Sequence, residues 1–138
     1  MEYIQKNIDV RVEKVDTTKK MLFGFGIVST LKGEPYIDLQ NEYIPENVVL
    51  DASTEFMESD SRPALAMHEG EPIGKVIHGF PLLGDIAKSM GIKTERTGFI
   101  VGVKIENDEV LKKYRNGEYT GFSLGGRARR VPNEEVGL

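Results

Sequence analysis

The segment of residues 97–105 constrains the fold most, because it is the most apolar strand-like stretch of the chain. Its sequence, TGFIVGVKI, is rich in the β-branched and aromatic residues that favour an extended backbone. A short apolar run without strict alternation is typical of a strand that is buried on both faces. We therefore expect residues 97–105 to form the central strand of a sheet.

Other segments predict strands around this one. Residues 7–15 alternate between apolar and polar side chains, and residues 20–30 follow after a short turn, so the two predict an antiparallel hairpin. Gly24 and Gly26 in the second strand indicate strong curvature or a close neighbour. Shorter strands are expected at 36–40, 64–68 and 73–80.

Two helices and a possible third complete the predicted elements. Pro45 suits the first turn of a helix that runs to about Glu58. Its expected buried stripe comprises Val48, Val49, Ala52 and Phe56, with Leu50 as a possible addition. Asn107 or Asp108 caps a helix at 108–115, and residues 82–90 form a short helix or a packed loop. These elements predict an α+β fold, a curved and mostly antiparallel β-barrel of six or seven strands with two or three short helices packed outside.

Composition excludes several classes of protein. The 138 residues suit one domain, residues 1–138, and a net charge of −4 opposes general attraction to nucleic acid. The chain has no cysteine, which excludes disulfides, thiolate catalysis and cysteine-ligated zinc. No apolar run reaches the roughly 20 residues that span a membrane. The first six residues lack the apolar region of a signal peptide.

The candidate catalytic residue is Ser123, in the sequence TGFSLGG. Glycines at 121, 125 and 126 surround it, and glycine lets a ligand approach the backbone closely. A serine nucleophile needs this access and nearby backbone N–H groups for an oxyanion. The segment also fits an ordinary strand that kinks at a Gly-Gly bulge. It does not match the G-x-S-x-G nucleophile elbow.

Two histidines and a basic run are the other candidates. His68 stands where a strand enters a turn, whereas His78 lies within a strand, and an isolated histidine is more often structural than catalytic. His68, Glu69 and Glu71 do not converge as metal ligands without the turn, so no metal site is expected. Residues 127–130, with three arginines, are weak evidence for phosphate binding.

The order of these motifs resembles that of the phage prohead maturation proteases, relatives of the herpesvirus assemblins. The resemblance extends over about residues 20–130. It is closest at residues 115–126, RNGEYTGFSLGG, which is similar to the family's serine segment. Residues 67–70, 74–77 and 98–105 resemble its histidine segment and two of its strands. Residues 38–42 replace its D-x-x-G-D segment, with Asn41 for Gly and Glu42 for Asp.

The resemblance implies a set of site residues. Ser123 would be the nucleophile and His68 the general base, with no cofactor. Backbone N–H groups of Leu124, Gly125 and Gly126, with help from Arg127, would hold the oxyanion. The third member would be Glu135, whose EVGL context resembles the family's acidic segment but comes early, so the domain would be truncated at its C-terminus. His78 is the other candidate for this position.

The implied function is a serine endopeptidase that cleaves scaffold and major capsid proteins inside an immature phage capsid, in the cytoplasm of the bacterial host. A homo-oligomer is expected, with no membrane and no nucleic acid as partner. A second hypothesis is a catalytically inactive capsid-assembly or scaffold module with the same fold. A third is a small β-barrel that binds nucleic acid through Arg127, Arg129 and Arg130.

Overall fold

The apolar segment expected at the centre of the sheet is β7 (Arg96–Ile105), which pairs with β6 (Pro72–Leu82) on one side and β3 (Met21–Leu31) on the other. Side chains of Val101, Val103 and Ile105 are fully buried. This computed structural model describes the backbone of residues 4–66 and 70–128 and the side chains of residues 8–66 and 70–125. Within that part of the chain, the central strand is confirmed.

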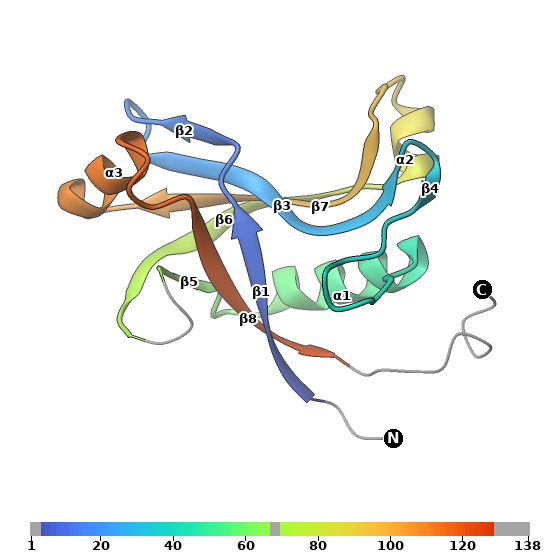
Figure 1. Ribbon diagram of the computed structural model, residues 1–138, viewed down its shortest axis with the longest axis horizontal. Coiled ribbons are helices and arrows are strands. Elements are labelled where there is room, and N and C mark those ends of the chain that lie inside the picture. The colour runs from blue at the N-terminus through green and yellow to red at the C-terminus, as the bar shows by residue number, and fades with distance from the viewer. Residues whose placement is uncertain (1–3, 67–69, 129–138) are drawn as a thin grey trace.

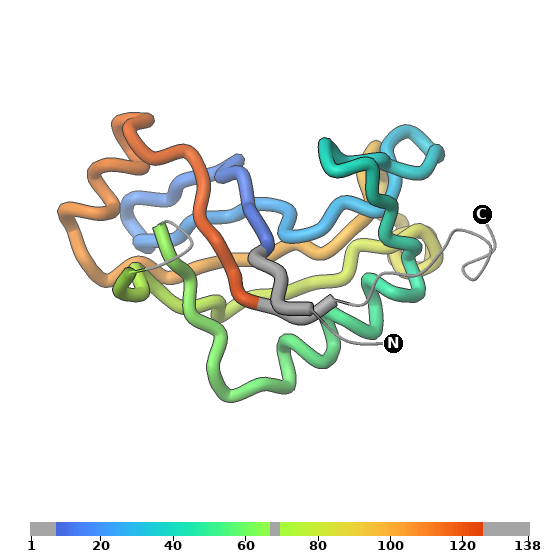
Figure 2. Tube along the Cα trace, turned by 60° about the horizontal axis from the view of Figure 1, so that its bottom comes forward, coloured from blue at the N-terminus to red at the C-terminus, as the bar shows by residue number. Residues whose placement is uncertain are grey.

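All strand pairs of the described chain are antiparallel, and they form one sheet in the order β1-β8-β5-β6-β7-β3-β2. Figure 2 shows β3, β7 and β6 running side by side, with β8 crossing in front of them. The short β4 pairs with β3 outside this order. The remaining strands are β1 (Ile4–Arg11), β2 (Lys14–Asp16), β4 (Glu34–Pro35), β5 (Pro63–Leu65) and β8 (Gly121–Ala128).

The two edge strands of this sheet, β1 and β2, are consecutive in the chain, so the sheet curls into a half-barrel (Figure 1). At the step between them, the Val12 N–H donates to the Thr120 carbonyl and the Glu13 N–H donates to the Phe23 carbonyl, both at 2.9 Å. The predicted α+β fold with a curved antiparallel sheet is confirmed.

The predicted hairpin of residues 7–15 with 20–30 is wrong over most of its length. Only β2 pairs with β3, whereas β1 leaves to pair with β8. The end of β1 nevertheless passes close to β3 at Gly24, because a Cβ added at Gly24 would overlap the Arg11 carbonyl oxygen. The close neighbour expected at Gly24 is therefore present. The curvature expected near Gly26 is also present, because the pairing with β7 shifts register between Phe25 and Ile27.

Helix α1 (Glu46–Glu58) covers one face of the sheet, and α2 (Gly84–Ser89) and α3 (Asp108–Arg115) lie at opposite ends of it (Figure 1). The expected stripe on α1 is correct at Val49 and Phe56 and wrong at Val48 and Ala52, which are exposed. The buried face instead continues from Val49 to Ser53, four residues along, because these positions share one side of a helix. In the described residues, no helix is long and apolar enough to cross a membrane.

The short strand predicted at residues 36–40 is not formed. The Asp38 carboxylate accepts the backbone N–H groups of Gln40 and Glu42, each at 2.9 Å, and Asn41 takes a left-handed φ of 60°. A side chain that satisfies its own local backbone in this way competes with strand pairing. Residues 36–45 therefore connect β4 to α1 as a loop.

Candidate active site

Ser123 lies in the middle of β8, between two neighbouring strands. Phe122 and Leu124, on either side of it, point into the core, so Ser123 projects from the opposite face of the sheet. It is nevertheless only 2% exposed. The pairing of β8 with β1 runs from Gly121 to Ala128 without a shift, so the bulge that the Gly-Gly pair allowed is absent.

The start of β8 is anchored by Tyr114 on α3. The Tyr114 phenol donates a hydrogen bond of 2.8 Å to the Gly121 carbonyl, two residues before Ser123. Burial raises the pKa of Tyr114 to about 12, with the charge of Tyr119 as a smaller cause. Asn107 caps α3 by accepting hydrogen bonds from the backbone N–H groups of Glu109 and Val110. Of the two predicted caps, Asn107 and Asp108, the structure therefore shows Asn107. The cap at the start of α3 and the phenol of Tyr114 together hold the segment that leads into β8 and Ser123.

On one side of Ser123 lies Asp9 of β1, its direct partner in the antiparallel register. Further along the same register, the Val12 N–H donates to the Thr120 carbonyl, so Val12 and Thr120 form a hydrogen-bonded pair. Because antiparallel pairs alternate, Asp9 and Ser123 form a non-hydrogen-bonded pair, the kind in which opposite side chains lie closest. Both side chains project from the face opposite the core. Asp9 is exposed at the edge of the sheet, beside the buried serine.

On the other side of Ser123 lies Leu65, the last residue of β5 and its partner in the register. His68 follows three residues later in the sequence, but it lies outside the described residues, as does Glu135. The predicted roles of these two residues therefore stay predictions.

The candidate oxyanion donors lie in the ladder of β8. Leu124 pairs with Ile8 and with Ala64, Gly125 pairs with Asn7, and Gly126 with Lys6. Gly125 is not among the described glycines with positive φ, and a Cβ added there would meet no atom within 4 Å. The strand therefore continues straight through Gly125 without a left-handed backbone. Whether these N–H groups hold an oxyanion stays a prediction.

His78 is remote from Ser123 within the sheet. Ser123 is opposite Leu65, and Leu65 is opposite Pro72 on β6. His78 lies six residues beyond Pro72, roughly 20 Å along the strand, where it is exposed and opposite Gly102. Its position does not favour a role beside Ser123.

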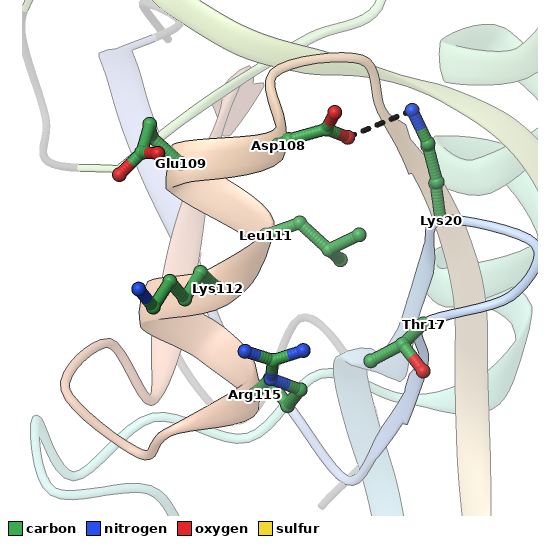
Figure 3. Close-up of a pocket in the computed structure, with 7 residues that line it drawn as sticks. All are labelled: Thr17, Lys20, Asp108, Glu109, Leu111, Lys112 and Arg115. Atoms are coloured by element: carbon green, nitrogen blue, oxygen red, sulfur yellow. Dashed lines mark ion pairs between the residues drawn. The ribbon is translucent and has the colours of Figure 1, made fainter.

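A separate hollow of about 330 Å³ lies between α3 and the turn that joins β2 to β3 (Figure 3). Lys20 and Asp108 form an ion pair of 2.8 Å across its rim. Its lining residues are Thr17, Lys20, Asp108, Glu109, Leu111, Lys112 and Arg115. The hollow contains neither Ser123 nor Asp9. Among the described residues, no group of three or more histidine, aspartate or glutamate side chains could hold a metal ion.

The position of Asp9 opposite Ser123 is a relationship that sequence reasoning did not predict. Its alternation with Ile8 and Val10 indicated only a polar position on a half-buried strand. The pairing of β1 with β8 brings together residues more than a hundred positions apart, and no local pattern contains that information.

With a serine at the centre of a glycine-rich strand in a curled antiparallel sheet, one candidate class for this protein is the β-rich serine hydrolases. The family model described as Putative phage serine protease XkdF matches residues 9–132. The chain therefore belongs to this phage serine protease family. No curated protein and no solved structure matches the chain.

Proposed function

We propose that this protein is a serine endopeptidase that processes scaffold and major capsid proteins during maturation of a phage prohead. The observation that carries the proposal is the position of Ser123 on β8, within the range that the family model matches. It is supported by β5, which pairs with Ser123 at Leu65 and precedes His68 in the sequence. The protein would act as a homo-oligomer inside the immature capsid, in the host cytoplasm.

The proposed reaction is acyl transfer through Ser123. Its Oγ attacks the peptide carbonyl while His68 takes the hydroxyl proton, and the carbonyl oxygen becomes an oxyanion that nearby N–H groups stabilise. The C–N bond then breaks, and His68 returns the proton to the leaving amine. Water hydrolyses the acyl-enzyme and regenerates Ser123. The resemblance assigns the third position to Glu135, and the reaction requires no cofactor.

Labelling with a fluorophosphonate tests this proposal without a known substrate. The Ser123 Oγ would form a bond to phosphorus, fluoride would leave, and the base would take the proton. We expect the wild type to be labelled and Ser123→Ala and His68→Ala to stay unlabelled while folding normally. Ser61→Ala, at an exposed serine, is the matched control and should label as the wild type does. Labelling that survives in Ser123→Ala would refute Ser123 as nucleophile.

A second candidate function, an inactive assembly module with the same fold, is favoured by one observation. Ser123 is only 2% exposed, and a nucleophile must be reached by its substrate. This candidate predicts no labelling of the wild type and no cleavage of co-expressed scaffold protein, together with retained binding to assembling capsids. Cleavage that disappears in Ser123→Ala would exclude it.

A further inference from the structure

The sheet has a second apolar cluster, on the face that points away from the core. Val101 of β7 belongs to the core, so the preceding residue, Ile100, projects from the other face. Phe25 of β3 and Phe80 of β6 are the direct partners of Ile100 in the register and share that face. Phe23, two residues before Phe25 on β3, projects from it as well. These four side chains form the outer cluster: Phe23, Phe25, Phe80 and Ile100.

No layer of the described structure covers the outer cluster. The core, to which α1, α2 and α3 all contribute side chains, contains none of its four members, and α1 lies on the other side of these strands (Figure 1). Phe80 is 36% exposed and the other three are half-buried. The Arg96 guanidinium, which is paired with Glu13, stacks on Phe25 at 4.4 Å from the ring centroid. A contiguous apolar surface of this kind is typical of an interaction site.

Lysines border the outer cluster at one end. Lys14 of β2 is the partner of Phe23 in the register, and Lys75 of β6 is the partner of Lys104 of β7. Within the described side chains, none of these three lysines is paired with a carboxylate. The Asp16 carboxylate, on β2, bonds the local backbone instead. Like charges directly opposite each other in a sheet are unfavourable, so a carboxylate from a partner would relieve the repulsion between Lys75 and Lys104.

The outward side of α1 has the complementary chemistry. The helix contains four acidic residues and no basic residue. Three of them, Asp51, Glu55 and Glu58, are exposed and share one side of the helix, because they are spaced by four and three positions. Val48 and Leu50, each 40% exposed, flank this acidic row. The uncovered side of α1 therefore combines carboxylates with apolar side chains, whereas the opposite face of the sheet combines lysines with phenylalanines.

We propose that α1 of one copy of this protein docks on the outer cluster of a second copy. The apolar flanks of α1 contact the phenylalanines, and its carboxylates lie beside the three lysines. The inference rests on the homo-oligomer of the proposed function and specifies the contact that forms it, whereas Ser123 has no part in it. Because α1 and the outer cluster lie on opposite faces of the sheet, each copy can donate one helix and accept another. Such a head-to-tail contact builds a ring or an open chain.

Sedimentation velocity of the full chain over a range of protein concentrations measures this assembly. We expect the wild type to assemble at high concentration and to dissociate as added salt screens the charges. Phe80→Ser, Lys75→Glu and Glu55→Lys should each raise the apparent dissociation constant roughly tenfold or more. The matched charge controls are Lys88→Glu and Glu118→Lys, at exposed positions outside both surfaces, and they should assemble as the wild type does. Melting temperatures check that every variant is folded.

Mixing two variants distinguishes the head-to-tail contact from other contacts. Lys75→Glu keeps the wild-type α1, and Glu55→Lys keeps the wild-type lysine border. Each variant alone should stay monomeric, and an equimolar mixture should form complexes that contain both. A mixture that stays monomeric would refute the docking. Wild-type assembly of Glu55→Lys together with dissociation of Phe80→Ser would also refute it, because the outer clusters would then pair with each other.

Failure of this inference is distinguishable from failure of the proposed function, because fluorophosphonate labelling of the same samples reports the serine chemistry. A wild type that is monomeric at every concentration but labels at Ser123 refutes the docking and leaves the serine chemistry standing. The outer cluster would then be available to a different protein. A wild type that assembles with the expected pattern of variants but does not label supports the docking and refutes the proposed peptidase.

Discussion

The Tyr114 phenol donates a 2.8 Å hydrogen bond to the Gly121 carbonyl, and so connects α3 to β8 two residues before Ser123. We predict that Tyr114→Phe lowers the free energy of unfolding by about 1 kcal/mol, because one buried hydrogen bond is lost and the Gly121 carbonyl loses its partner. Urea denaturation measures the change. Tyr36→Phe removes an exposed hydroxyl and should be nearly silent. Equal stability of the two variants would show that the phenol does not hold β8.

The raised pKa of Tyr114 predicts how the stability of the fold changes at alkaline pH. Burial raises its pKa from 10.0 to about 12, so between these values the folded state keeps a proton that the unfolded state has lost. The contribution of Tyr114 to stability is therefore fully present below pH 10 and is lost as pH rises towards 12. A titration of tyrosinate absorbance should show a late-ionising tyrosine in the wild type that is missing from Tyr114→Phe. A late phase in both proteins would contradict the assignment.

Glycines 121 and 125 flank Ser123 but should respond in opposite ways to substitution. A Cβ at Gly121 would lie 2.8 Å from the Val10 carbonyl oxygen, whereas a Cβ at Gly125 meets no atom within 4 Å. We expect Gly121→Ala to cost about 1–3 kcal/mol of stability, because β1 and β8 must move apart. Gly125→Ala should leave stability nearly unchanged.

Urea denaturation and amide hydrogen exchange check the glycine prediction. In Gly121→Ala, protection should fall for the amides of β1 at Val10, the residue whose carbonyl is displaced. Gly125→Ala, which lies on the same strand, is the control for a general effect of alanine in β8. Comparable losses of stability in both variants would mean that the close approach at Gly121 is not the cause.

The parts of the fold that sequence predicted are those that local chemistry determines. Residues 97–105 are apolar on both faces, and a strand of that kind has few places other than the centre of a sheet. Asn107 predicted the start of α3 because its side chain can accept two backbone N–H groups. The serine strand was likewise predicted from its own residues, and it runs from Gly121 to Ala128.

The sequence-based predictions were wrong for segments whose backbone could bond either to a local or to a distant partner. Residues 36–40 have a strand-like composition, but the Asp38 side chain bonds the local backbone first. Residues 7–15 were matched with the nearest strand in sequence, yet β1 pairs with β8, more than a hundred residues away. The same long-range pairing places Asp9 opposite Ser123, a neighbour that no local pattern could predict.

The third member of the site is decided by comparing two single variants for fluorophosphonate labelling at one pH and matched concentration. If Glu135 orients the base, as the resemblance to the prohead proteases implies, Glu135→Gln should be the slow variant and His78→Ala should label at the wild-type rate. His78 is expected to be silent because it is exposed and far along β6 from Ser123. A slow His78→Ala with a normal Glu135→Gln would assign the position to His78 instead. Wild-type rates in both variants would leave Ser123 and His68 to act as a dyad.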